Sequence, residues 1–169
     1  TSDRVREALF SALDSALGAW AGVRVLDLYA GSGALGLEAA SRGAAHVTLV
    51  ERDRRALTTL RANVAAVALP GAVVRAGDVA RVVAAPAPEP YDLVLADPPY
   101  DLASTEVEHV LGLLAGGGWL APGARVVVER DRRHGFAWPD GYRPEPERRY
   151  GDTVLAHALW YRRDADSDQ

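Results

Sequence analysis

The chain has 169 residues and a mass of 18.0 kDa, a length that fits one domain with a substantial hydrophobic core. Hydrophobic residues make up 49% and charged residues 25%, and no apolar run is as long as a transmembrane helix or resembles a signal peptide. The absence of Cys excludes disulfide scaffolds, thiolate zinc sites and cysteine nucleophiles, and it fits a cytoplasmic protein. The net charge of −4 does not by itself indicate nucleic-acid binding.

Two further features of the composition bear on source and charge. The sequence contains no Met, so we expect that Thr1 is not the translation start and that further sequence precedes it. It also contains no Lys or Ile, which suggests a genome rich in GC. All 19 of its Lys and Arg residues are therefore Arg, and six of them crowd residues 130–149, where a solvated charged face is as good an interpretation as a binding surface.

In chain order, apolar runs alternate with amphipathic segments. Residues 1–17 are predicted to be a helix, because Val5, Leu9 and Leu13 recur every four residues and Ser2 or Asp3 can cap it. Buried strands are predicted at 23–29, 46–50, 72–75, 91–96 and 124–129. Helices are predicted from the glycine-rich loop to about 42, from 53 to about 70 and over 105–115, with a helical turn at 79–85.

The C-terminal part has a different pattern. Residues 142–150 are polar, Gly151 and Asp152 signal a turn, and residues 153–161 alternate like a strand, which predicts a closing antiparallel hairpin. Alternating strands and helices followed by a hairpin predict an α/β, doubly wound, mostly parallel sheet with one antiparallel edge. This is the plan of the Rossmann-like methyltransferases.

A glycine-rich loop at residues 31–36 matches G-x-G-x-x-G between a predicted strand and a helix. Its glycines let the backbone approach a ligand, and the helix N-terminus favours negative charge. Glu51 ends the next strand about 20 residues later, where such folds place a carboxylate on ribose hydroxyls. Together these features predict a nucleoside-containing cofactor, and the loop alone fits NAD as well as S-adenosyl-L-methionine.

Two more acids favour the methyl donor. Asp27 lies in the strand before the loop and resembles motif I of S-adenosylmethionine-dependent methyltransferases. Asp78 follows the third strand, where that fold meets the adenine amine. NAD enzymes have no reason to carry the Asp-Pro-Pro-Tyr sequence that follows the fourth strand, so the methyl donor is the preferred interpretation.

That tetrapeptide is Asp97-Pro98-Pro99-Tyr100. Pro cannot continue a central strand and restricts the residue before it, so we expect a rigid loop; a plain Pro-Pro turn is the alternative for the tetrapeptide alone. The tetrapeptide resembles motif IV of the amino-methyltransferases. This resemblance implies that Asp97 and the Pro98 carbonyl accept the two N–H bonds of an exocyclic amine while Tyr100 stacks on the base, with no metal and no covalent enzyme intermediate.

Four further stretches resemble one family, the RsmD-type 16S rRNA guanine-N2 methyltransferases. They are its opening helix, its motif I, the turn after motif I and its C-terminal hairpin, at residues 1–10, 26–39, 41–44 and 149–153. The opening helix and the Tyr-Gly-Asp-Thr turn are much more specific than the glycine loop. The likeness extends from Thr1 to about Tyr161.

The resemblance implies transfer of one methyl group from S-adenosyl-L-methionine to N2 of a guanine in small-subunit rRNA, position 966 in the usual rRNA numbering. It implies a class I methyltransferase fold with a seven-stranded sheet in one domain over residues 1–163, a disordered tail at 164–169, and a monomer acting on 16S rRNA or the assembling subunit. The implied catalytic residues are Asp97, Pro98 and Tyr100, and the implied substrate-binding residues are Pro99, Tyr100, Arg4 and Arg6. The implied cofactor-binding residues are Asp27, Tyr29, Gly31, Ser32, Gly33, Glu51, Arg52, Asp78 and Val79.

Some residues have a structural interpretation beside the functional one. The family has a basic, Gly-rich segment before the first helix that this sequence lacks. Arg4 and Arg6 could equally form helix-surface pairs with Asp3 or Glu7. Asn63 more plausibly caps or packs than binds a ligand. Structural or surface roles are also expected for His46, His109, His134 and His157, and packing roles for Trp119, Trp138 and Trp160.

Three rival functions fit parts of the same sequence. Within the same class, the chain could methylate a DNA or tRNA base, because Asp-Pro-Pro-Tyr does not choose among bases. In a different class, it could be a non-catalytic cofactor-binding factor in RNA assembly, although such a factor has no need of the acceptor carboxylate. An NAD oxidoreductase is the most distant alternative.

Overall fold

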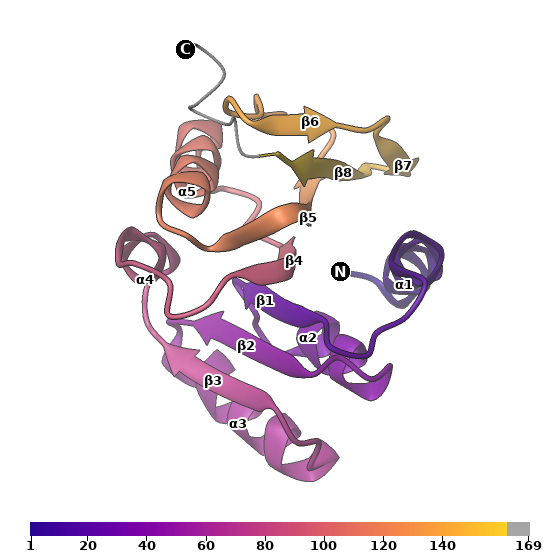
Figure 1. Cartoon of the computed structure of the whole chain (residues 1–169), viewed down its shortest axis with the longest axis vertical. Coiled ribbons are helices and arrows are strands. Elements are labelled where there is room, and N and C mark those ends of the chain that lie inside the picture. The colour runs from indigo at the N-terminus through magenta and orange to yellow at the C-terminus, as the bar shows by residue number, and fades with distance from the viewer. Residues whose placement is uncertain (162–169) are drawn as a thin grey trace, which may run out of the picture.

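The computed structural model describes residues 1–161, so the predicted tail at 164–169 and the last two residues of the predicted domain lie outside the described part. Five helices and eight strands form a central sheet with helices on both faces (Figure 1). Among the described residues, no helix is long and apolar enough to cross a membrane. In chain order the elements are α1 (Asp3–Leu17), β1 (Arg24–Leu28), α2 (Ala34–Ser41), β2 (His46–Glu51), α3 (Arg54–Val67), β3 (Ala72–Ala76), α4 (Val79–Ala84), β4 (Tyr91–Ala96), α5 (Ser104–Gly116), β5 (Leu120–Asp131), β6 (Tyr142–Pro144), β7 (Arg148–Tyr150) and β8 (Thr153–Trp160).

The strand order explains where a ligand can bind. It runs β3-β2-β1-β4-β5-β8-β6, with β3, β2, β1, β4 and β5 parallel and β8 antiparallel to β5. After β1 the chain winds toward β2 on one side and later returns to place β4 on the other. A crevice therefore opens at the carboxyl ends of β1 and β4, the usual ligand site of such a sheet. The predicted Rossmann-like fold with an antiparallel C-terminal edge is confirmed.

The seventh position of the sheet is shared by two short strands, which the sequence pattern did not resolve. Both β6 and β7 pair with β8, β6 along Ala158–Trp160 and β7 along Thr153–Leu155. Pro146 lies between them and has no N–H to donate, so the ladder is interrupted there. The predicted hairpin therefore exists as a broken strand against β8.

Two hydrophobic cores fill the two faces of the sheet. Residues alternate along each strand, so that in β1 Leu26 and Leu28 face one core and Val25 the other. The first core includes α4 and α5, and the second includes α1, α2 and α3; Figure 1 shows α4 and α5 on the side away from α1. The buried side chains of Trp119 and Trp160 belong to the first core, which confirms their predicted packing role.

Side-chain caps begin three of the helices. The Ser2 hydroxyl accepts a hydrogen bond from the Val5 amide, so of the two predicted caps Ser2 is the one used. Asp53 caps α3, as predicted. Asp78 caps α4, a short helix at the place where the sequence predicted a helical turn. β5 begins earlier than predicted, at Leu120, because Leu120 already pairs with Tyr91 of β4. Pro122 and Gly123 lie between this first pair and the regular part of the ladder, where the register shifts.

Candidate functional site

A cavity of about 390 Å³ opens at the carboxyl ends of β1, β2, β3 and β4. It gathers residues from the four loops that follow these strands, together with Thr1 before α1 and Glu106 in α5. Most of the predicted cofactor-binding residues lie on it, as do Asp97 and Pro99, whereas Gly33, Pro98, Tyr100, Arg4 and Arg6 do not. The lining residues are Thr1, Asp27, Tyr29, Ala30, Gly31, Ser32, Ala34, Leu35, Glu51, Arg52, Gly77, Asp78, Val79, Ala80, Asp97, Pro99, Leu102 and Glu106.

The glycine loop forms one wall of the cavity, and its two glycines do different work. Gly31 has φ +58° and open space where a Cβ would stand, so it lets a ligand approach the backbone. Gly33 has φ +87°, and a Cβ there would lie 2.5 Å from the Leu60 side chain. Gly33 is therefore required by the turn and by packing against α3, and it does not itself line the cavity.

The loop includes a residue with strained backbone and is held by one side chain of α3. Tyr29 adopts φ +58°, an uncommon conformation for a residue with a side chain, and lines the cavity. Burial raises the pKa of Tyr29 to about 12, so the phenol stays neutral. The Asn63 side-chain amide donates a hydrogen bond to the Ser32 carbonyl at 2.8 Å. Asn63 therefore packs against the loop, as the structural interpretation predicted, and fixes its position.

Glu51 ties the glycine loop to the end of β2. One carboxylate oxygen accepts the Gly31 amide at 2.8 Å, and the other accepts the amides of Arg52 and Asp53 at 2.7 and 2.9 Å. These three bonds fix a carboxylate at the cavity wall. Each oxygen can accept more than one hydrogen bond, so the group can still bind hydroxyls of a ligand.

The far end of the cavity is formed by the residues after β3. Asp78 accepts the Arg81 amide at 3.3 Å as the cap of α4, and its other oxygen lies 3.4 Å from the Arg52 guanidinium. Both side chains of this ion pair are well exposed, so the pair contributes little to stability and is available to rearrange around a ligand. Val79, the first residue of α4, lines the cavity beside Asp78.

Asp27 is a carboxylate with unused bonding capacity at the base of the cavity. Its side chain is 1% exposed; Oδ2 accepts the Gly36 amide at 2.9 Å, whereas Oδ1 has no partner. Burial raises the pKa of Asp27 to about 7, and the charges of Asp97 and Glu51 add to the rise while the Gly36 amide opposes it. A buried acceptor without a partner favours a ligand that brings positive charge or an N–H donor.

The acceptor loop, defined here as residues 97–103 between β4 and α5, closes the other end of the cavity. Asp97 is half-buried and Pro98 buried, while Pro99 is exposed and Tyr100 is 74% exposed. Tyr100 meets the His134 ring edge-on, with centroids 6.0 Å apart. The loop therefore presents one carboxylate inward and one aromatic face outward.

A second carboxylate lies beside Asp97 and was not among the predicted site residues. Ala96 pairs with Val128 across β4 and β5, so Asp97, which follows β4, lies beside Glu129, which is still in β5. The Thr1 hydroxyl bonds both, at 2.7 Å to Asp97 and more closely to Glu129. Burial and the Asp97 charge raise the pKa of Glu129. The only sequence signal was an acid near the end of the fifth predicted strand.

The two arginines of α1 are placed differently from the cavity residues. Arg6 forms an ion pair with Asp3 at 3.2 Å, the helix-surface arrangement that was the alternative to substrate binding. Arg4 is exposed. A role for either in binding RNA stays a prediction.

Comparisons with known proteins agree with this geometry. A family model described as conserved hypothetical protein 95 matches residues 1–159, nearly the whole chain. The chain belongs to this family. The protein named Ribosomal RNA small subunit methyltransferase D from Escherichia coli (strain K12) is 39% identical over 143 residues, which cover 80% of this chain and 66% of that protein. The chain thus spans just under two thirds of the length of that family member.

Other members of the family are similar over more of their length. The Haemophilus influenzae protein of the same name is 30% identical over 163 residues, covering 95% of this chain and 81% of the relative. The solved structure of yhhF from Escherichia coli superposes with a TM-score of 0.86 at 33% identity, covering 96% of this chain and 88% of that one. The predicted resemblance to the RsmD-type family is confirmed.

Proposed function

We propose that this protein transfers a methyl group from S-adenosyl-L-methionine to the exocyclic N2 amine of a guanine in small-subunit ribosomal RNA. Family membership and the names of the relatives support a ribosomal RNA methyltransferase. The cavity supports a donor site at one end and an amine site at the other. A substrate in assembling ribosomes implies the cytoplasmic location expected from the sequence.

The residues present fit the proposed donor. S-adenosyl-L-methionine carries an amino-acid group with an ammonium and a carboxylate, a ribose and an adenine, and it supplies an electrophilic methyl group on a cationic sulfonium. Asp27, with an unpartnered buried oxygen, suits the ammonium. The fixed Glu51 carboxylate suits the ribose hydroxyls, and Asp78 with Val79 suits the adenine. Gly31 leaves room for close approach of the donor to the backbone.

The acceptor loop supplies what an exocyclic amine needs. The lone pair of such an amine is delocalised into the base, so the nitrogen is a poor nucleophile. Asp97 at the cavity wall accepts one N–H bond, and the Pro98 carbonyl accepts the other, which orients the nitrogen and favours pyramidal geometry. Asp97 is also the group placed to accept the proton that the amine gives up. Tyr100, exposed beside His134, offers a face for a base taken out of its stack.

The pair of carboxylates at Asp97 and Glu129 is the observation that favours guanine over adenine and cytosine as the methylated base. Ionised carboxylates only accept hydrogen bonds. Guanine presents two neighbouring donors, N1–H and the N2 amine, whereas adenine and cytosine present an amine beside a ring nitrogen that is an acceptor. Glu129 beside Asp97 therefore complements guanine and repels the other two edges.

The test is methyl transfer from labelled donor to small-subunit RNA and to assembling subunits, followed by mass spectrometry of the nucleosides. We expect N2-methylguanosine, and we expect Asp97→Ala to abolish it. Asp101→Ala is the matched control, because this exposed acid lies on the same loop and does not line the cavity. Label found only in DNA, tRNA or protein, or donor binding without turnover on any RNA, would contradict the proposal.

A further inference from the structure

Arg130 is a buried cation that the donor and acceptor roles described above do not use. Its side chain is 4% exposed, near the end of β5, and it has no ion-pair partner among residues 1–161. A buried charge without a counter-ion is costly unless polar groups surround it. The structure therefore has to compensate this guanidinium in another way.

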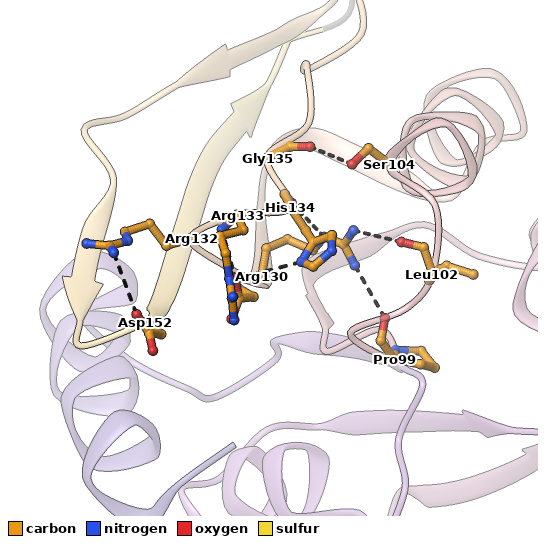
Figure 2. A network of polar contacts seen from close by, with 10 residues as sticks. Pro99, Leu102, Ser104, Arg130, Arg132, Arg133, His134, Gly135 and Asp152 are labelled. Atoms are coloured by element: carbon orange, nitrogen blue, oxygen red, sulfur yellow. Dashed lines mark hydrogen bonds and ion pairs between the residues drawn. The ribbon is translucent and has the colours of Figure 1, made fainter.

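Three backbone carbonyls provide the compensation, and they come from two different loops (Figure 2). Nη2 donates to Leu102 O at 2.8 Å and Nη1 to Pro99 O at 3.4 Å, both in the acceptor loop. Nε donates to His134 O at 2.9 Å, in the turn over residues 131–135, which we call the arginine turn. One guanidinium thus joins the acceptor loop to the arginine turn.

The bonds fix backbone groups next to the proposed reaction. Pro99 and Leu102 both line the cavity. Pro99 O also accepts the Leu102 amide at 2.9 Å, so its direction is set from two sides. Holding Pro99 O toward Arg130 fixes the peptide between Pro99 and Tyr100 and, with it, the direction in which the chain leaves the two prolines.

The arginine turn lies beside the acceptor loop and presents exposed basic side chains to solvent. Arg132 and Arg133 are 59% and 78% exposed, and His134 contacts Tyr100. A second bond, from the Ser104 hydroxyl to Gly135 O at 2.6 Å, ties the turn to the start of α5. The turn therefore cannot shift without moving the acceptor loop.

We propose that Arg130 is a positioning residue that holds the acceptor loop in its reactive geometry and couples it to the arginine turn. A guanidinium suits this role because its planar fork of five N–H donors serves carbonyls in different directions, which the single ammonium of Lys does not. The consequence for the rate rests on the proposed function, whereas the ordering of the loop does not.

The experiment compares Arg130→Met, Arg130→Lys and Arg61→Met with the unaltered protein. Arg61 is an exposed residue of α3 that does not line the cavity, and it controls for the loss of one Arg. We expect Arg130→Met to make the amides of residues 100–104 exchange hydrogen about tenfold faster, because their loop opens locally. We expect its kcat for RNA methylation to fall about a hundredfold with donor affinity nearly unchanged, and Arg130→Lys to lie between.

Unchanged exchange in residues 100–104 would overturn the proposal, as would a loss that appears in donor affinity and thermal stability but not in kcat. Arg130→Lys keeps the test decisive if Arg130→Met does not fold. If the unaltered protein methylates no RNA, the proposed function fails, and the exchange measurement still decides whether Arg130 orders the loop.

Discussion

At the scale of single residues, the site is defined by carboxylates whose surroundings differ. Glu51 accepts three backbone amides and keeps capacity for more, Asp78 is exposed and paired with Arg52, and Asp27 is buried with one oxygen without a partner. Asp97 and Glu129 lie together, so a ligand must bring donors to both. On the proposed function, these carboxylates bind the ribose, the adenine, the ammonium of the donor and the base.

The pKa of Asp27 predicts how donor binding depends on pH. In the free protein this pKa is about 7, so the carboxyl is largely protonated below neutral pH. A cationic donor favours the ionised form, so binding must release a proton, and affinity should fall by up to about tenfold per pH unit below 7. Calorimetry between pH 5.5 and about 8.5 measures this fall, and Asp27→Asn should flatten it. A pH-independent affinity in the unaltered protein would contradict the assigned role.

The role assigned to Glu129 predicts base selectivity. Glu129→Gln places an amide where guanine N1–H needs an acceptor-only group, so kcat/KM on guanine should fall about tenfold to a hundredfold. Discrimination against adenine and cytosine in the same RNA context should weaken with it. Glu147→Gln, an exposed acid between β6 and β7, is the control. Unchanged selectivity in Glu129→Gln would show that the second carboxylate does not contact the base.

At the scale of elements, contacts from neighbouring helices and strands hold the loops that form the site. Residues of α3 contact the glycine loop at two points, the Leu60 side chain behind Gly33 and the Asn63 amide on Ser32 O. The loop carries the strained Tyr29 and two left-handed glycines, so it depends on such contacts to keep one conformation. Arg130 does the corresponding work for the acceptor loop.

The contact from α3 predicts a donor-binding defect without a ligand contact. Asn63→Ala removes one hydrogen bond to the glycine loop, worth about 1 kcal/mol, and should weaken donor binding about fivefold. Thr59→Ala, on the exposed face of the same helix, should leave donor affinity unchanged. Titration calorimetry separates the two variants. Equal donor affinity in both would mean that the loop keeps its shape without Asn63.

At the scale of the whole molecule, the sequence predicted the features that are local in the chain. The alternation of strands and helices, the glycine loop with Glu51, and the break at Asp97-Pro98 were readable because each depends on neighbouring residues. The role of Glu129 as a second carboxylate and the contacts of Arg130 with the loops could not be predicted from the sequence. Glu129 meets Asp97 through strand register, and Arg130 finds carbonyls 28 and 31 residues away. Such partners are chosen by tertiary packing, which a single sequence does not display.

The boundaries that were missed have the same origin. Pro146 divides the last sheet position only because β8 offers partners on both sides of it, and β5 extends to Leu120 because β4 pairs with its irregular start. Gly33 looked like a ligand contact in the motif, whereas packing on Leu60 explains it. A motif can thus locate a site correctly, but the role of each of its residues becomes clear only from the three-dimensional structure.

Nucleoside mapping of small-subunit rRNA from cells with and without this protein tests the proposed function in the cell. We expect one N2-methylguanosine to disappear when the gene is deleted. It should return with the unaltered gene and with Asp101→Ala, but not with Asp97→Ala. If every N2-methylguanosine of the small-subunit rRNA persists after deletion, this protein is not the guanine-N2 methyltransferase that we propose.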